Sequence, residues 1–381
     1  MPGPKKESNL MTNKRQAGFT LLETMVALVI LLGVSAVILS GLVQMTKTQG
    51  TIVNRTEMHT SVRSATELLQ QEIGQAGKIS LPAAPAAGWQ MLPVAPGATP
   101  DAPITAVATF TVGMPLYEGE WVTVDTGLPR ETVQLKCPAG IGACPIGTIA
   151  WLATFTWPHP APPAVLGPVP ASIQGAFSTG IVPPAAGVMP NPPVGYAGYP
   201  MFPAGPPAYP YPNSPNQGST GNVLKLYGDL NGDGNMVYVE YTCVQGTPNN
   251  PGFLYRNQVP WTSLALPPID PSMIVLTSVL PNPPDANGNP VPCFTYQLQT
   301  QDTVNAAAKD YAFVTDVAVT LTVQTSNEDP QTHQFQTETK ALLNVSPRNV
   351  YDAYLSSTLD YTDRIQPMPL NLKGVILPNY Q

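Results

Sequence analysis

The sequence is poor in charge and in the side chains that enzymes use for chemistry. Charged residues make up 11% of the 381 residues, against about a quarter in ordinary soluble domains. Its three histidines, His59, His159 and His333, are scattered, so we expect them at the surface rather than in a zinc site. No Gly-x-Ser-x-Gly, Walker or dinucleotide-binding motif occurs. We therefore expect no catalytic site and no enzyme.

Basic residues are scarce beyond the N-terminus. The formal net charge is −7, and residues 1–18 carry +3, which leaves −10 for the rest of the chain. Proteins that bind nucleic acids need clustered Lys and Arg to neutralise phosphates. We therefore expect no nucleic-acid partner.

Proline is abundant, with 46 copies, and 18 of them fall between residues 158 and 217. Because proline lacks a backbone N–H and fixes φ, this stretch is not expected to supply a regular sheet. We assign 158–218 as a Pro-, Gly- and Tyr-rich loop insertion. Two interpretations stay open: a variable surface insertion, or an exposed contact surface in which Pro and Tyr offer apolar contact at low entropic cost.

The N-terminal segment is basic and then strongly apolar. The run from Met25 to Val43 has only small or weakly polar interruptions and is long enough to span a bilayer as a helix. A secretory signal peptide or a plain membrane anchor would share these features. No Ala-x-Ala-like cleavage site stands out after the run, however, and Glu23 lies inside its entry. A carboxylate is costly in a membrane, so Glu23 is expected to have a partner.

Residues 14–23, KRQAGFTLLE, resemble the processing site of type IV prepilins and type II secretion pseudopilins. The resemblance implies that a prepilin peptidase cleaves after Gly18, that the new N-terminal Phe19 is methylated, and that Glu23 serves filament assembly. It also implies other pilin subunits and an inner-membrane assembly platform as partners. Met11 is an alternative start, which would give the leader MTNKRQAG.

A physical role for Glu23 follows from that resemblance. Cleavage would leave an α-amino group on Phe19, which is cationic at neutral pH. An unpaired carboxylate in a filament core of low dielectric is strongly unfavourable. We therefore expect Glu23 of one subunit to pair with Phe19 of a neighbour and to set their axial register.

The helix is predicted to continue past the membrane, from about Thr20 to about Ala76. Beyond residue 57, apolar residues recur in steps of three or four, which marks one face of a helix. They are Met58, Val62, Ala65, Leu69, Ile73 and Ala76. Gly77 is a good residue for the end of the helix, with Pro82 soon after. The apolar face is expected to pack against a sheet.

The remainder of the chain contains strand-like segments. They are Ile104–Val112, Trp121–Val124, Glu131–Lys136, Thr148–Phe155, Asn222–Tyr227, Met236–Val244, Gly252–Asn257, Met273–Leu280, Cys293–Gln299, Val314–Gln324 and His333–Val345. Within Asp316–Gln324 apolar residues alternate with polar ones, as in a half-buried antiparallel strand. Its expected partner is Gln334–Leu343.

We therefore expect an α+β, pilin-like fold, in which one long N-terminal helix packs on an antiparallel β-sheet domain with long Pro-rich loops. The expected divisions are a leader (1–18), the helix (19–77, membrane-spanning over about 20–43), a first β part (78–157), the insertion (158–218), a sheet part (219–350) and a tail (351–381).

Two further segments, 67–77 and 346–350, resemble large minor pilins of the PilW type and J-type pseudopilins, although Gly74-Gln75 stands where those proteins usually have Arg. The resemblance implies a structural subunit that primes or caps a type IV pilus or type II secretion filament. It would sit in the inner membrane before assembly and in a periplasmic or extracellular filament afterwards. The alternative is a filament-tip adhesin that uses the Pro/Tyr-rich insertion.

Residues 229–240, DLNGDGNMVYVE, match the calcium-loop pattern D-x-[DN]-x-[DN]-G-x5-E. The expected ligands are Asp229, Asn231, Asp233, the Asn235 carbonyl and Glu240. The flanks, however, read as strands, and Asn-Gly and Asp-Gly are strong turn formers on their own. Calcium and a plain hairpin turn stay open as alternatives.

Four cysteines in a chain that looks exported suggest disulfides. Cys137 and Cys144 bracket a small closable loop, while Cys243 and Cys293 lie in or beside predicted strands. We favour the pairs 137–144 and 243–293.

Overall fold

The computed structural model describes residues 18–80, 90–92, 98–110, 116–125, 130–140, 144–145, 147–159, 168–173, 177–184, 218–263, 265–301, 311–359 and 361–367. Its main helices are α1 (Leu21–Gln75) and α2 (Arg348–Thr358), with single 3-10 turns at η2 (Pro271–Met273) and η3 (Thr362–Arg364). Its strands are β1 (Gln90–Met91), β2 (Ile104–Thr109), β3 (Trp121–Val124), β4 (Glu131–Gln134), β5 (Ala150–Phe155), β6 (Val169–Ile173), β7 (Phe177–Ser178), β8 (Val223–Gly228), β9 (Val237–Val244), β10 (Gly252–Pro260), β11 (Ile274–Leu280), β12 (Phe294–Gln301), β13 (Tyr311–Gln324), β14 (Thr337–Val345) and β15 (Ile365–Gln366).

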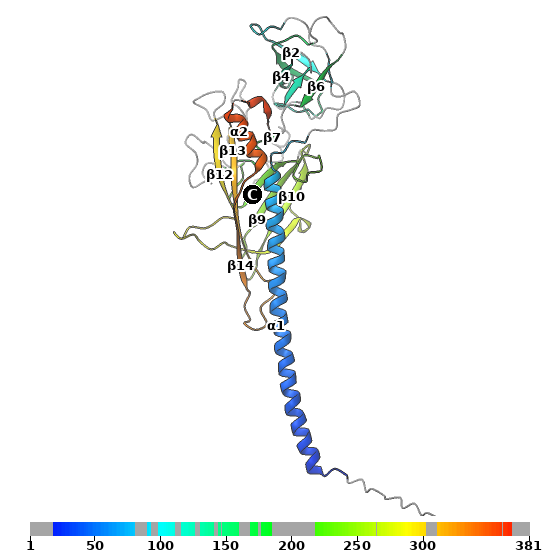
Figure 1. Ribbon diagram of the computed structural model, residues 1–381, viewed down its shortest axis with the longest axis vertical. Coiled ribbons are helices and arrows are strands. Elements are labelled where there is room, and N and C mark those ends of the chain that lie inside the picture. The colour runs from blue at the N-terminus through cyan, green and yellow to red at the C-terminus, as the bar shows by residue number, and fades with distance from the viewer. Residues whose placement is uncertain are drawn as a thin grey trace, which may run out of the picture.

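Helix α1 is long enough to serve two environments. Its 55 residues extend about 80 Å at 1.5 Å per residue, and its N-terminal half projects away from the rest of the molecule (Figure 1). The helix ends at the C-cap Ala76, after which Gly77 adopts a φ of 82° that favours glycine. The predicted helix over 20–76 is confirmed to within one residue at each end.

The C-terminal half of α1 packs against the large sheet. The predicted apolar face is confirmed, because all six of its residues are buried in the main core. That core also contains Leu226 of β8, Val239 of β9 and Val317 of β13. Burial of this face stabilises the second half of the helix, whereas the first half has no such packing against the sheet.

The large sheet is antiparallel and has seven strands. The order is β12-β13-β11-β10-β9-β8, with β14 also paired to β13. The alternation predicted over 316–324 is confirmed, because Val317, Val319, Leu321 and Val323 are all buried in the core. The predicted partner, 334–343, is confirmed as well, since β14 pairs with β13 from Thr337 onward.

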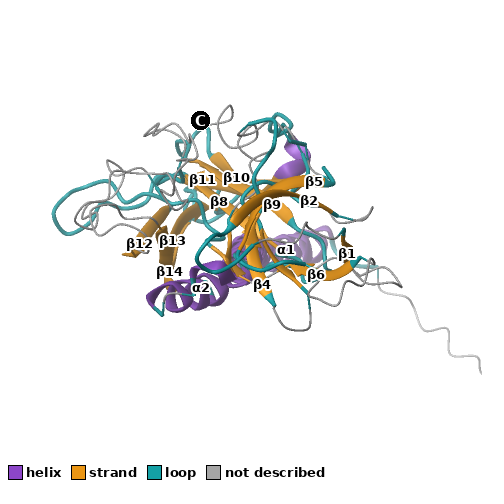
Figure 2. Cartoon of the chain, turned by 90° about the horizontal axis from the view of Figure 1, so that it is seen from above, coloured by secondary structure: helices purple, strands orange, loops and turns teal. Residues whose placement is uncertain are grey.

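The first β part forms a separate small barrel. Two sheets, β1-β6-β3-β4 and β2-β5, are joined by the bridges Lys136–Leu152 and Met91–Phe110, so that six strands close into a ring. Its interior is a second core that includes Trp151 and Phe155. The barrel lies at the end of the molecule opposite the bare end of α1 (Figure 1), and Figure 2 shows that end from above. Closure leaves few unpaired strand edges.

Two expectations about irregular segments are wrong. The Pro-rich stretch does supply regular pairing, because β6 lies between β1 and β3. Its proline, Pro170, pairs with Gln90 of β1 and lies outside the part of β6 that pairs with β3, which begins at Ala171. Similarly, the first residues of the expected tail, 351–358, belong to α2, whose Val350 and Ala353 are buried in the main core. Residues 160–167, 174–176 and 185–217 of the insertion lie outside the described residues.

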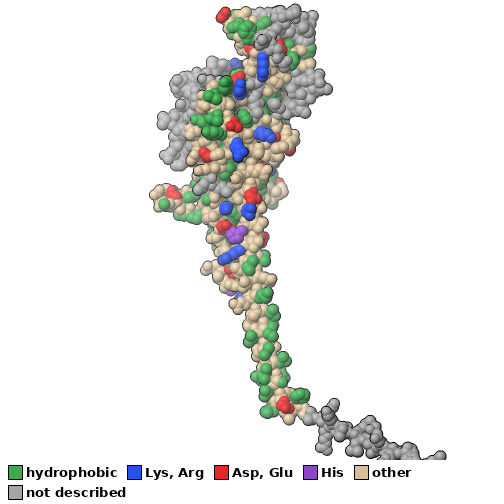
Figure 3. All heavy atoms as spheres, viewed as in Figure 1, with side chains coloured by type: hydrophobic (Ala, Val, Ile, Leu, Met, Phe, Trp, Pro, Cys, Tyr) green, Lys and Arg blue, Asp and Glu red, His purple; other side chains and the backbone are tan. Residues whose placement is uncertain are grey.

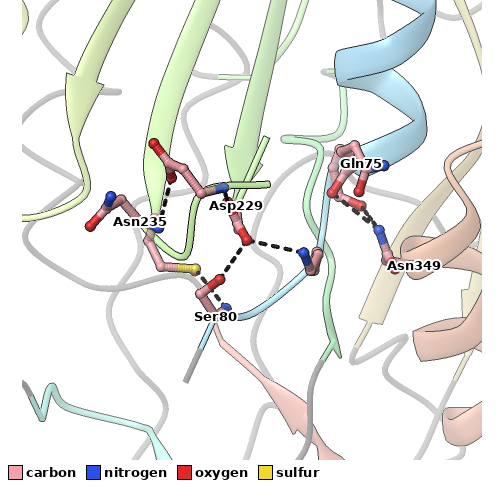
Figure 4. Close-up of polar contacts among 9 residues, drawn as sticks. Gln75, Ser80, Asp229, Asn235 and Asn349 are labelled. Carbon is pink, nitrogen blue, oxygen red and sulfur yellow. Dashed lines mark hydrogen bonds and ion pairs between the residues drawn. The ribbon is translucent and has the colours of Figure 1, made fainter. Parts of the chain in front are cut away.

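Helix α2 also closes the end of α1. The Asn349 side-chain amide donates to the carbonyl of Gln75 at 3.1 Å and to that of Ala76 at 3.4 Å (Figure 4). The last carbonyls of a helix have no partner within it, so these bonds stabilise the helix terminus. Residue propensities do not predict this helix, because it contains the β-forming residues Val350, Tyr351 and Tyr354.

Both expected disulfides are present. Cys137 and Cys144 are joined with their Cα atoms 5.7 Å apart, in the barrel core. Cys243 of β9 is joined to Cys293, which precedes β12, with their Cα atoms 6.5 Å apart in the main core. Each core therefore has its own covalent link.

Candidate processing and assembly site

The start of α1 is closed by a reciprocal pair of side chains. The Thr20 hydroxyl accepts from the Glu23 backbone N–H at 3.3 Å, and the Glu23 carboxylate accepts from the Thr20 backbone N–H at 3.0 Å. The Thr20 hydroxyl also donates to that carboxylate at 3.1 Å. This capping box satisfies two N–H groups that the helix leaves free.

The residues around the expected cleavage point are accessible. Phe19 is 85% exposed, and Gly18 lies outside regular secondary structure with no atom within 4 Å of the position that a side chain would take. Glu23 is exposed too, and among the described residues its carboxylate bonds with Thr20. The site is therefore open both to a peptidase and to a second subunit.

Thr20 is the residue that sequence reasoning missed. The signal is present in the sequence, since Thr20 and Glu23 stand three apart immediately before an apolar helix, as in the capping-box pattern. Glu23 therefore has a local role within one chain besides the intersubunit role that the resemblance implies.

The first half of α1 exposes a continuous apolar surface. Figure 3 shows hydrophobic side chains along the whole projecting stretch. From Leu21 to Val53 every Leu, Ile, Val and Met is more than half exposed. By length and composition this helix could cross a membrane, and none of its most apolar window is buried within the chain. Such a surface is too large for a monomer in water and needs a bilayer or neighbouring helices.

The other half of α1 is fixed to the sheet by a buried ion pair. Glu72, 3% exposed, accepts from Arg256 Nε at 2.9 Å and from the Tyr241 hydroxyl at 2.6 Å. Burial raises the pKa of Tyr241, and the neighbouring Glu72 carboxylate raises it further. Removing one partner of such a pair would leave a charge buried alone. The helix and the sheet are thus held as one unit at this end.

The candidate calcium loop is a turn between β8 and β9. Asp229 is buried, and its carboxylate accepts from Ser80 Oγ at 2.6 Å, Lys78 Nζ at 3.1 Å and the Asp233 backbone N–H at 3.1 Å (Figure 4). Burial raises the pKa of Asp229, but the hydrogen bonds from Ser80 and Lys78 outweigh it, so that the pKa lies below its ordinary value. This carboxylate is already satisfied by protein groups.

Glu240 is not part of that turn. It is the fourth residue of β9, opposite Lys225 of β8, and accepts from the Tyr238 hydroxyl at 3.0 Å. Three residues of strand separate it from the start of β9, about 10 Å. The five expected ligands therefore do not form one set, and the described residues contain no group of three His, Cys, Asp or Glu that could hold a metal. Calcium binding stays a prediction.

The expectation that His159 lies at the surface is wrong. Its side chain is fully buried, with Nε2 3.1 Å from Glu131 Oε2 and Nδ1 3.7 Å from Asp125 Oδ2. The Glu131 carboxylate supplies a hydrogen-bond partner for Nε2, whereas Nδ1 has no hydrogen-bond partner among the described residues. His59, in contrast, is on the exposed side of α1, where it contacts Glu338.

Comparison with known proteins identifies the N-terminal segment. Residues 13–40 match the family model of the prokaryotic N-terminal methylation motif. No curated protein and no solved structure matches the chain. The match covers the candidate cleavage point, the capping box and the first part of the bare half of α1, as far as residue 40, and it supports a type IV prepilin-like protein that assembles with other pilins.

Proposed function

We propose that this protein is a minor pilin or pseudopilin, processed after Gly18 and incorporated near the tip of a type IV pilus or type II secretion filament. The observation that carries the proposal is the division of α1 into two halves. One half is bare and apolar, beginning within the methylation motif, and the other is buried against a sheet. A helix of this kind can leave a membrane and enter a bundle of like helices without refolding of its head.

The Glu23 carboxylate is suited to register the subunits in that bundle. The bare half of α1 offers packing but little direction, because apolar contact is non-directional. When one carboxylate and one terminal ammonium meet in an apolar environment, they fix the axial offset between adjacent subunits, as a buried polar residue fixes the register of a coiled coil. Before assembly, the capping box keeps Glu23 hydrogen-bonded.

The size of the head favours a minor rather than a major subunit. About 300 residues follow the helix, and the described ones form a sheet domain with the small barrel above it (Figure 1). Neighbours in a tightly packed filament would have to accommodate that bulk at every subunit. At a tip the head meets subunits on one side alone.

Quantitative mass spectrometry of sheared filaments tests this role. We expect the protein in the filament fraction at a small fraction of the main subunit, and we expect its deletion to reduce the number of filaments. Amounts equal to those of the main subunit would contradict the minor role. Complete absence from filaments would contradict incorporation.

The adhesin alternative depends on the insertion, of which 185–217 lies outside the described residues. Its 18 prolines between 158 and 217 and its tyrosines are the features in its favour. Deleting 160–215 distinguishes the two roles in principle, but β6 and β7 lie within that range and belong to the fold. A deletion confined to 185–217 spares both strands. The adhesin role predicts filaments of normal number with impaired adhesion.

A further inference from the structure

A cavity of about 490 Å³ lies between the barrel and the large sheet. Its walls come from six parts of the chain: the segment after α1, the loop before β3, the end of β6, strand β8, the turn between β8 and β9 with the start of β9, and the end of β10 with the residues after it. It is separate from the processing site and from the bare half of α1. Cavities at the junction of two folded units are common places for small ligands.

Three aromatic side chains line the cavity, Tyr117, Tyr227 and Trp261. The rings of Tyr117 and Trp261 meet edge to face, with centroids 5.7 Å apart and planes at 67°. The Tyr117 hydroxyl donates to the Pro367 carbonyl at 3.0 Å, which fixes that ring. Tyr227 is buried within β8. The aromatic wall is thus held in place by the fold.

The charges that line the cavity are of one sign. Glu120 is 2% exposed, and Asp233 lies on the exposed turn. No Lys, Arg or His is among the described residues that line it. Glu120 accepts a hydrogen bond from the Tyr117 backbone N–H at 3.2 Å, but that neutral donor does not balance a buried carboxylate. Burial holds the pKa of Glu120 well above its ordinary value, as expected for a carboxyl without a counter-ion.

The turn that resembles a calcium loop is one rim of this cavity. Asn231, Asp233 and Asn235 all line it. Asp229 anchors the turn to Ser80 (Figure 4), which also lines the cavity. The turn therefore places one carboxylate and two amides, which can donate and accept, around the opening.

We propose that this cavity binds a small organic ammonium ion. The positive group would lie against the faces of Tyr117 and Trp261, where ring quadrupoles attract cations, with Glu120 as its buried counter-ion. Anions are disfavoured because the described residues that line the space include two carboxyl groups and no base. A neutral ligand would leave the Glu120 carboxyl without a counter-ion. The amides of the rim bind the polar remainder of the ligand.

This inference goes beyond the filament role and does not depend on it. A ligand that touches both the barrel and the sheet would also join the two units, since its contacts come from Tyr117 and Glu120 on one side and Trp261 on the other. Failure of ligand binding would leave the processing and assembly account untouched, and the reverse also holds.

Calorimetry on the full-length protein in detergent micelles tests the proposal, with choline chloride as probe. Its matched control is 3,3-dimethyl-1-butanol, which has the same shape with carbon in place of the charged nitrogen. We expect choline to bind at least fivefold more tightly than the neutral isostere. Equal affinities, no detectable binding of choline, or tighter binding of glucose than of choline would each overturn the assignment.

Two variants locate the site. Glu120→Gln keeps the size of the side chain and removes its charge, and Trp261→Ala removes one aromatic face. Each should weaken choline binding at least fivefold, while Trp157→Ala, an exposed tryptophan of the barrel outside the cavity, should leave it unchanged. Melting curves of each variant establish that it is folded. Folded Glu120→Gln protein with undiminished choline affinity would refute the role of the carboxylate.

Discussion

The same substitution placed in each half of α1 tests the division of that helix. Leu69 is fully buried between α1 and the sheet, whereas Leu42 is 54% exposed in the bare half. Leu→Ala has the same small effect on helix propensity at both sites. Any difference in the stability of the head therefore reports on packing.

The expected cost at Leu69 is large because the site cannot collapse. The buried pair of Glu72 and Arg256 holds the helix to the sheet one turn further on, and the Gly77 N–H donates to the Tyr227 carbonyl at 2.9 Å. A cavity left by Leu69→Ala should thus persist, at a cost of about 3 kcal/mol. For a domain of this size we expect the melting temperature to fall by about 6–12 °C.

Thermal unfolding of the full-length protein in detergent, followed by near-UV circular dichroism, measures the head directly. Leu69→Ala should show the fall, and Leu42→Ala should melt with the unsubstituted protein. A fall of similar size for both variants would mean that the bare half of α1 also packs on the head. No fall for Leu69→Ala would mean that the helix is not fixed to the sheet.

Three further outcomes follow. Glu23→Gln should reduce recovery of the protein in sheared filaments by about tenfold or more, since it removes the charge that pairs with a neighbour's terminal ammonium. Thr20→Ala loses the cap but keeps the carboxylate, and it should still assemble. Loss of assembly in Thr20→Ala but not in Glu23→Gln would mean that Glu23 serves only to cap the helix. Replacing Cys243 and Cys293 by Ser should lower the free energy of unfolding by about 4 kcal/mol, and replacing Cys137 and Cys144 by about 2.5 kcal/mol, because the second disulfide closes a smaller loop of the unfolded chain. Denaturant unfolding measures both losses, and equal losses would contradict the chain-entropy argument. Calcium and EGTA distinguish the two interpretations of the turn at 229–235. Since protein groups already engage Asp229, a plain turn predicts an unchanged melting temperature, whereas calcium binding predicts a rise with calcium that EGTA reverses.

Features that repeat at short range could be predicted from the sequence. The apolar face of α1 follows from steps of three and four residues, and the buried face of β13 follows from alternation between Val317 and Val323. The pairing of Cys137 with Cys144 follows from their closeness along the chain. In each case the pattern lies within one segment and needs no knowledge of the tertiary fold.

Features that depend on distant partners could not be predicted. The burial of His159 requires Asp125, which follows β3, and Glu131 of β4 to lie beside it. Helix α2 forms from a sequence rich in β-formers because Val350 and Ala353 find a place in the main core, a tertiary effect that overrides propensity. The cavity joins segments more than 100 residues apart, such as Glu120 and Trp261, so no local pattern marks it.

N-terminal peptide mass spectrometry on sheared surface filaments tests the central claim most directly. The account predicts a peptide that begins at methylated Phe19 in that fraction, which would establish processing after Gly18 and incorporation into a filament together. An intact leader, or cleavage after the apolar run with the protein absent from filaments, would contradict it and would mean that the chain is an anchored or secreted domain of another kind.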